Sequence, residues 1–140
     1  MKFIIFFAIN IVFSIHLFAQ SLTISIEIFT DNYPDETSWT LEDDDGNIID
    51  QISAGELDCS NTYYNWDINI NDNTCYTFTI FDSYGDGICC SQGNGSYTIT
   101  SNNVIYTGGQ FNNSEMVSSI CNPVLVGCID YNASNYNALA

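Results

Sequence analysis

The sequence is almost without positive charge. Its one lysine, Lys2, and its one histidine, His16, lie near the start, arginine is absent, and the formal net charge is −16 at pH 7. A chain that loses its leader on export would hold no basic side chain. This excludes histidine general bases, Ser-His-Asp and Cys-His nucleophiles, lysine Schiff bases and histidine metal ligands from the exported chain. It also excludes nucleic-acid binding, which relies on Lys and Arg to neutralise phosphates.

The first residues have the pattern of a secretory signal peptide. Lys2 precedes a mainly apolar run from Phe3 to Phe18, and Ala19 is a small residue at which cleavage is expected. A membrane anchor would need about 20 uninterrupted apolar residues, and this run is shorter and contains polar residues. We therefore predict that residues 1–19 are a signal peptide, that the protein is secreted or displayed on the cell surface, and that no membrane span remains after cleavage.

The six cysteines fit an exported, disulfide-stabilised protein. A zinc site is disfavoured because the spacing lacks paired C-x-x-C motifs and the exported chain has no histidine. Cys89 and Cys90 are adjacent, and neighbouring side chains of an extended segment point to opposite faces, so we predict that each pairs with a distant partner. The disulfide candidates in the folded region are Cys59, Cys75, Cys89, Cys90 and Cys121.

Alternating apolar and polar residues predict an all-β fold. The segment 22–29 places three isoleucines on one face and polar residues on the other, as in a half-buried strand. About eight short strands separated by turn residues indicate an antiparallel β-sandwich of the jelly-roll or CUB-like kind, which we assign to residues 20–122. The other strands are expected at 39–41, 48–52, 63–70, 75–81, 96–100, 104–106 and 115–121, and the predicted core contains Trp39, Tyr76, Phe78, Ile80, Tyr97 and Ile99.

An acidic, glycine-rich stretch, Asp82–Cys90, follows the strand predicted at 75–81. Its aspartates, Asp82 and Asp86, can supply hard oxygen ligands, and Gly85 and Gly87 permit the positive φ angles that wrap a backbone around an ion. The alternative is a tight turn in which the aspartates only accept hydrogen bonds from nearby amides. The composition of the chain favours the ion, because no cationic side chain is present to neutralise these carboxylates.

A second acidic stretch, Thr30–Trp39, follows the first strand. Loops of a sandwich gather at its two ends, so Asp31 and Glu36 are expected to meet Asp82 and Asp86. The alternative is an ordinary turn held by Pro34. Together the four carboxylates predict one calcium ion, because Ca²⁺ accepts six to eight oxygens in irregular geometry whereas Mg²⁺ needs a near-ideal octahedron.

A third acidic stretch, 43–47, begins like an EF-hand loop. It lacks the downstream glutamate and the flanking helices of that motif, and its Asp-Gly pair is typical of a hairpin tip. We predict a solvated hairpin here.

Several of these stretches resemble one family. The segments Thr30–Pro34, Glu36–Trp39, Cys75–Ile80, Gly93–Tyr97 and Gly108–Phe111, and above all the string Asp82-Ser83-Tyr84-Gly85-Asp86-Gly87-Ile88-Cys89-Cys90, are similar to an accessory β-sandwich module of secreted multidomain proteins, notably of Bacteroidetes. The resemblance covers about residues 22–121 and implies a non-catalytic extracellular module. Similar modules often carry a cysteine shortly before the position of Cys75; this chain lacks it, and the resemblance implies that Cys59 takes its role.

The segment after Pro123 has a different sequence pattern from the predicted sandwich. Residues 127–137, which include Cys128, resemble the opening of a short cysteine-bounded acidic repeat that occurs in arrays on similar surface proteins. We therefore interpret 123–140 as a linker and the start of such a repeat, and we expect the chain to be the N-terminal part of a larger multidomain protein.

Three function classes follow from the sequence. The first is a calcium-stabilised, non-catalytic interaction module whose partner is an extracellular protein or polysaccharide. The second is a carbohydrate-binding module of a secreted hydrolase or adhesin. The third is an enzyme with a carboxylate pair, which a domain of this size has little chain to equip with a cleft. The stacking platform of the second class would be formed by Tyr33, Tyr63, Tyr64, Trp66 and Tyr84.

Overall fold

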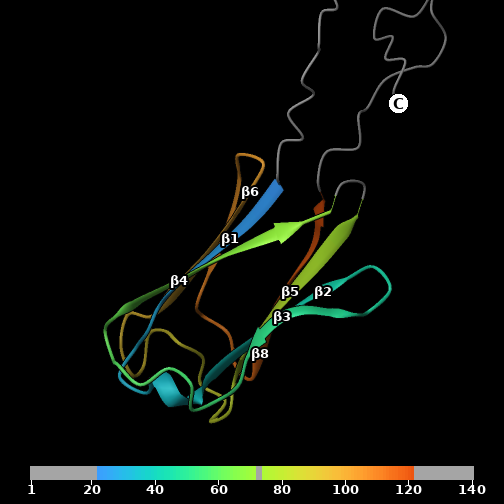
Figure 1. Ribbon diagram of the computed structural model, residues 1–140. Coiled ribbons are helices and arrows are strands. Elements are labelled where there is room, and N and C mark those ends of the chain that lie inside the picture. Colours follow the sequence, from blue (N-terminus) through green and yellow to red (C-terminus); the bar gives the residue numbers. More distant parts are fainter. Residues whose placement is uncertain (1–21, 72–73, 122–140) are drawn as a thin grey trace, which may run out of the picture.

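A computed structural model describes residues 22–71 and 74–121, which form two four-stranded antiparallel sheets (Figure 1). The strand order is β4-β1-β6-β7 in one sheet and β3-β2-β5-β8 in the other. This confirms the predicted all-β sandwich with eight strands. The strands are β1 Leu22–Phe29, β2 Thr37–Asp43, β3 Ile48–Ile52, β4 Tyr63–Ile70, β5 Cys75–Asp82, β6 Ser96–Ser101, β7 Val104–Gly108 and β8 Ser114–Cys121, with a 3₁₀ helix at Pro34–Glu36.

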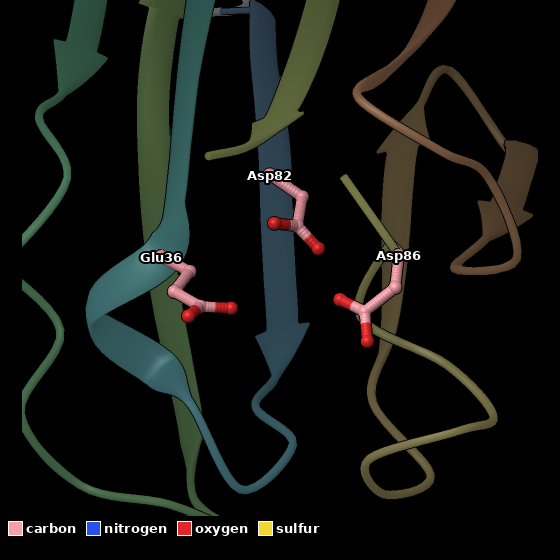
Figure 2. Close-up of side chains that lie close together, drawn as sticks. All are labelled: Glu36, Asp82 and Asp86. Carbon is pink, nitrogen blue, oxygen red and sulfur yellow. The ribbon is translucent and has the colours of Figure 1, made fainter. Parts of the chain in front are cut away.

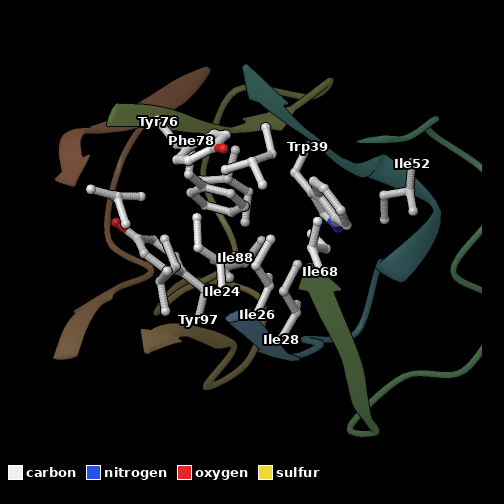
Figure 3. Close-up of a cluster of buried hydrophobic side chains, with 14 of the residues drawn as sticks. Ile24, Ile26, Ile28, Trp39, Ile52, Ile68, Tyr76, Phe78, Ile88 and Tyr97 are labelled. Atoms are coloured by element: carbon white, nitrogen blue, oxygen red, sulfur yellow. The ribbon is translucent and has the colours of Figure 1, made fainter. Parts of the chain in front are cut away.

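The core lies between the two sheets and is built by strand alternation. In β1, Ile24, Ile26 and Ile28 are fully buried, and the polar residues between them face outward. All six core residues expected from the sequence are buried, as Figure 3 shows for Trp39, Tyr76, Phe78 and others. The rings of Trp39 and Phe78 have centroids 5.9 Å apart, so the aromatic residues of the two central strands of one sheet pack together.

The chain runs up and down through the sandwich, so alternate connections lie at the same end. The connections that follow β1, β3, β5 and β7 form what we call the loop end, residues 30–36, 53–62, 83–95 and 109–113. The connections that follow β2, β4 and β6 form the opposite hairpin end, where β1 also begins and β8 ends (Figure 1). The two acidic stretches both follow odd-numbered strands, and they meet at the loop end as predicted.

The 43–47 stretch forms the expected hairpin between β2 and β3. Asp43 Oδ1 accepts hydrogen bonds from the backbone amides of Asp45 and Asn47, at 3.0 and 2.8 Å. Hydrogen bonds from the Asn47 side-chain amide, and then these backbone bonds, hold the pKa of Asp43 below its ordinary value of 3.8. Asp43 therefore stabilises the turn locally.

The disulfides differ from the prediction at three cysteines. Cys75 and Cys121 are bonded and join β5 to β8. Cys89 and Cys90 are bonded to each other, so the prediction of separate distant partners is wrong. That prediction assumed extended backbone, whereas this segment lies in the loop between β5 and β6. Cys59 is exposed and unbonded within the described part of the chain, which contradicts the role that the resemblance implied for it.

Other predictions concern residues that the structure does not describe. The signal peptide at 1–19 and the repeat at 123–140, with Cys128, lie outside the described residues. Within 22–71 and 74–121, no helix has the length and apolar character needed to cross a membrane.

Candidate metal-binding site

Three of the four carboxylates proposed as ligands converge at the loop end. Oxygen atoms of Glu36, Asp82 and Asp86 all lie within 4.8 Å of one another. Figure 2 shows the three side chains directed toward a common point, Glu36 from the 3₁₀ helix, Asp82 from the end of β5 and Asp86 from the loop that follows. Two residues come from one stretch and the third from a segment more than forty positions earlier in the chain.

Asp82 is held in place by the start of its own loop. It is only 4% exposed, and its Oδ1 accepts hydrogen bonds from the amides of Tyr84 and Gly85, at 2.7 and 3.1 Å. This is the local turn that the sequence left as the alternative to an ion site. The turn and a metal site are compatible, because both amides bind one oxygen and the carboxylate has two.

The loop that follows Asp82 contains two glycines in backbone conformations with positive φ. Gly85 and Gly87 have φ angles of +97° and +72°, as their positions in the motif indicated. The loop then brings Asp86 against Ser91, whose hydroxyl donates a hydrogen bond of 3.1 Å to Asp86 Oδ2. Asp86 is therefore held in place by a hydrogen bond from a residue later in the same loop.

Glu36 is positioned by the short helix and by a bond between the two acidic loops. Pro34 starts the 3₁₀ helix, consistent with its fixed φ. The amide of Ser83 donates a hydrogen bond of 3.0 Å to the carbonyl of Glu36, which ties the β1–β2 connection to the β5–β6 connection. The two stretches thus meet through backbone contacts as well as through their charged side chains.

Asp31, the fourth predicted ligand, does not join this group of three. It is 4% exposed, and its Oδ1 accepts a hydrogen bond of 2.9 Å from the amide of Tyr33. This hydrogen bond closes the turn that precedes the 3₁₀ helix. The carboxylate of Asp31 is nevertheless close enough to Asp82 and Asp86 for their negative charges to act on it. The structure therefore narrows the predicted ligand set from four carboxylates to three, with Asp31 beside them.

The electrostatics show that these carboxylates are not neutralised by the protein. Burial, followed by the charges of Asp82 and Asp86, raises the pKa of Asp31 above its ordinary value of 3.8. Burial and then the charge of Asp82 likewise raise the pKa of Glu36 above 4.5. The described residues contain no Lys, Arg or His that could offset these effects. Negative charge gathered here therefore destabilises the fold in the absence of a bound cation.

A pocket of about 180 Å³ opens beside the three carboxylates. Tyr33 and Tyr84 flank it, and Glu36, Asp86 and Gln92 complete its lining. The tyrosine side chains are 48% and 76% exposed. Sequence reasoning missed Gln92, because this residue lies beyond the recognisable motif and reaches the pocket only through the fold of the 83–95 loop.

The five aromatic residues proposed as a stacking platform do not form one surface. Tyr64 and Trp66 point into the sandwich, where Trp66 packs edge-on against Trp39 with centroids 5.2 Å apart. Tyr33 and Tyr84 lie at the loop end. Tyr63 lies on the outer face of the β4-β1-β6-β7 sheet and is 67% exposed. The single platform predicted from the sequence is therefore wrong.

Comparisons with protein-family models, with curated protein sequences and with solved structures find no match to this chain. The family resemblance of the acidic motif thus stays a prediction.

Proposed function

We propose that this domain is a secreted, non-catalytic interaction module whose loop end is stabilised by one calcium ion bound to Glu36, Asp82 and Asp86. The observation that carries the proposal is the convergence of three carboxylate oxygens within 4.8 Å, from loops distant in sequence, with no cationic residue in the described chain. Calcium binds oxygens at 2.3–2.6 Å, so two ligands of one ion lie at most about 5 Å apart. The separations of the three carboxylate oxygens, all within 4.8 Å, fit this limit.

The non-catalytic assignment rests on what surrounds the carboxylates. The pocket of about 180 Å³ is smaller than the 300–1,000 Å³ typical of small-molecule sites. A bound ion is a simpler occupant of this space than a substrate.

The ion would hold together two loops that lead to different strands. Glu36 directly precedes β2, and Asp82 ends β5, the neighbouring strand in the same sheet. Binding at this point would fix the loop end as a rigid surface, which suits an interaction module whose partner is an extracellular protein or polysaccharide. The acidic loops are thus assigned a structural role in this proposal.

Thermal unfolding with and without calcium tests the proposal. An ion that binds only the folded state stabilises it by about 2.7 kcal/mol at a hundredfold excess over Kd. We expect the melting temperature of chelator-treated protein to rise with millimolar Ca²⁺, and rise less with Mg²⁺. Calorimetric titration should give one calcium per chain.

Substitutions separate ion binding from general stability. Glu36→Gln should abolish the calcium response while leaving the metal-free protein as stable as before or more stable, because it removes a carboxylate whose charge is unfavourable. Asp82→Asn should also abolish the response. Asp45→Asn, which removes an exposed carboxylate at the β2–β3 turn, is the matched control and should respond normally. A melting temperature indifferent to calcium, or a normal response in Glu36→Gln, would contradict the proposal.

A further inference from the structure

The outer face of the β4-β1-β6-β7 sheet carries a continuous polar surface distant from the carboxylates. Pairing of β1 with β4 and β6 aligns Ser25 with Asp67 and with Thr100, so these three residues form one row across the sheet. Asn69 and Thr23 form the next row toward the hairpin end. Their neighbours along each strand are buried or half-buried residues of the inner face, so strand alternation directs these five outward.

This face is hollowed into a groove. Its volume is about 570 Å³, which lies within the range of small-molecule sites. Most of its lining side chains carry a hydroxyl or an amide, and the other two are one carboxylate and one aliphatic residue. The lining consists of Leu22, Thr23, Ser25, Asp67, Asn69, Thr100, Asn102 and Asn103.

An aromatic pair lies on the same face toward the loop end. Phe29 and Tyr63 are cross-strand partners with ring centroids 4.6 Å apart, and Tyr63 is 67% exposed. Phe29 is six residues beyond Thr23 on β1, which corresponds to about 20 Å along the strand. The face therefore presents a polar groove and an exposed ring along one line.

The chemistry of this face selects among possible occupants. Among the outward residues of β4, β1 and β6, only Asp67 and Glu27 are charged, and both are negative. An anionic polymer or membrane would find no cation here, and the net charge of −16 would repel it. A second copy of the chain stacked on this face would oppose the same unneutralised carboxylates. A strongly cationic partner would be drawn instead to the carboxylates of the loop end.

A neutral carbohydrate matches the groove. A sugar presents many hydroxyls, which can donate to Asp67 and both donate to and accept from Asn69, Ser25 and Thr100. The C–H face of a pyranose ring is apolar and packs on an exposed aromatic ring such as that of Tyr63. We propose that this outer face binds a neutral polysaccharide chain, with Asp67 and Asn69 as its main hydrogen-bonding residues. The proposal goes beyond the calcium site and does not require it.

Native affinity electrophoresis tests the proposal with defined probes. The exported protein is run through gels that contain mixed-linkage β-glucan, arabinoxylan or galactomannan, and through gels that contain the acidic polymers alginate or polygalacturonate. We expect at least one neutral polymer to retard the protein, with the affinity read from the dependence on polymer concentration. Neither acidic polymer should retard it.

Two groove variants and two controls locate the binding. Asp67→Ala and Asn69→Ala should each weaken binding, Asp67→Ala by about tenfold or more, as expected for loss of a hydrogen bond to a charged group. Glu42→Ala removes the same charge from the opposite sheet, on strand β2, and should bind normally. Treatment with chelator, the second control, should also leave binding unchanged, which distinguishes this surface from the calcium site.

Four results would overturn the proposal: no retardation by any of the three neutral polymers, equal retardation by an acidic polymer, undiminished binding in both groove variants, or loss of binding on chelation. Melting curves of the variants are recorded alongside, and because Asp67 and Asn69 are exposed, we expect both variants to fold. Failure of calcium binding alone would leave the carbohydrate result intact, so the two proposals are tested separately.

Discussion

Two glycines with similar backbone angles differ in what surrounds them. Gly87 has φ of +72° and Gly46 has φ of +79°, both in the left-handed region. A Cβ at Gly87 would meet the carbonyl of Phe111, whereas at Gly46 nothing lies within 4 Å. The motif glycine therefore serves two purposes, a positive φ and a close approach of two loops, while the hairpin glycine serves only the first.

Alanine substitution of these glycines should separate the two effects. Gly46→Ala is expected to cost about 1–2 kcal/mol, the penalty of a left-handed conformation for a residue with Cβ. Gly87→Ala should cost a further 1–3 kcal/mol or so, the usual range for overpacking. Urea unfolding of the metal-free variants measures both. Equal losses at the two positions would show that the contact with Phe111 is relieved by movement of the loop.

At the scale of elements, the strands and their grouping followed from simple patterns. Period-two alternation identified the eight strands. Because the loops of a sandwich gather at its two ends, the sequence predicted that the stretches of Glu36 and Asp82 meet. Strand order was not readable from the sequence, because many pairings bury the same alternating faces.

The errors arose where local conformation departs from a regular element. Cys89 and Cys90 lie in an irregular loop, where strand alternation does not predict which cysteines pair. Asp31 was grouped with the other carboxylates on its loop position alone, but its side chain turns to the amide of Tyr33. Tyr64 and Trp66 were counted as exposed although they alternate into the core.

The bond between Cys75 and Cys121 clamps the last strand to a central one. It closes a loop with a sequence separation of 46, for which the chain-entropy model gives about 4 kcal/mol. We expect the double variant Cys75→Ser/Cys121→Ser to lose stability of this order in urea unfolding. Cys59→Ser, which removes an exposed thiol, should change the unfolding free energy by less than about 0.5 kcal/mol. A comparable loss in Cys59→Ser would indicate that this thiol has a partner after all.

At the scale of the whole molecule, uncompensated negative charge sets the response to pH. The raised pKa values of Asp31 and Glu36 mean that the folded state binds more protons than the unfolded chain, from their ordinary values of 3.8 and 4.5 upward. Unfolding free energy therefore falls as pH rises through this window. The lowered pKa values of Asp43 and Asp58, held down by hydrogen bonds from Asn47 and Tyr64, act in the opposite sense and below 3.8.

The metal-free protein should accordingly be more stable at about pH 4, near the ordinary pKa values of these two groups, than at pH 7. Melting curves in chelator across this range measure the effect, and Glu36→Gln should reduce it. Saturating calcium should flatten or reverse the trend, because the ion requires deprotonated carboxylates. Stability of the chelated protein that rises steadily toward pH 7 would contradict the electrostatic account of the loop end.

The covalent link between β5 and β8 also determines how the domain transmits tension. A pull applied at Leu22 and at Cys121 reaches Cys75 directly through the sulfur bridge, so the intervening chain carries no load. Force can extend only the chain that precedes Cys75. About 150 Å of contour length between Cys75 and Cys121 cannot extend until the disulfide is reduced. The segment closed by the disulfide contains Asp82, Asp86 and the whole 83–95 loop. Glu36 lies in the part of the chain that can extend. Mechanical extension would therefore separate Glu36 from Asp82 and Asp86 before it stretched the segment that bears these two aspartates.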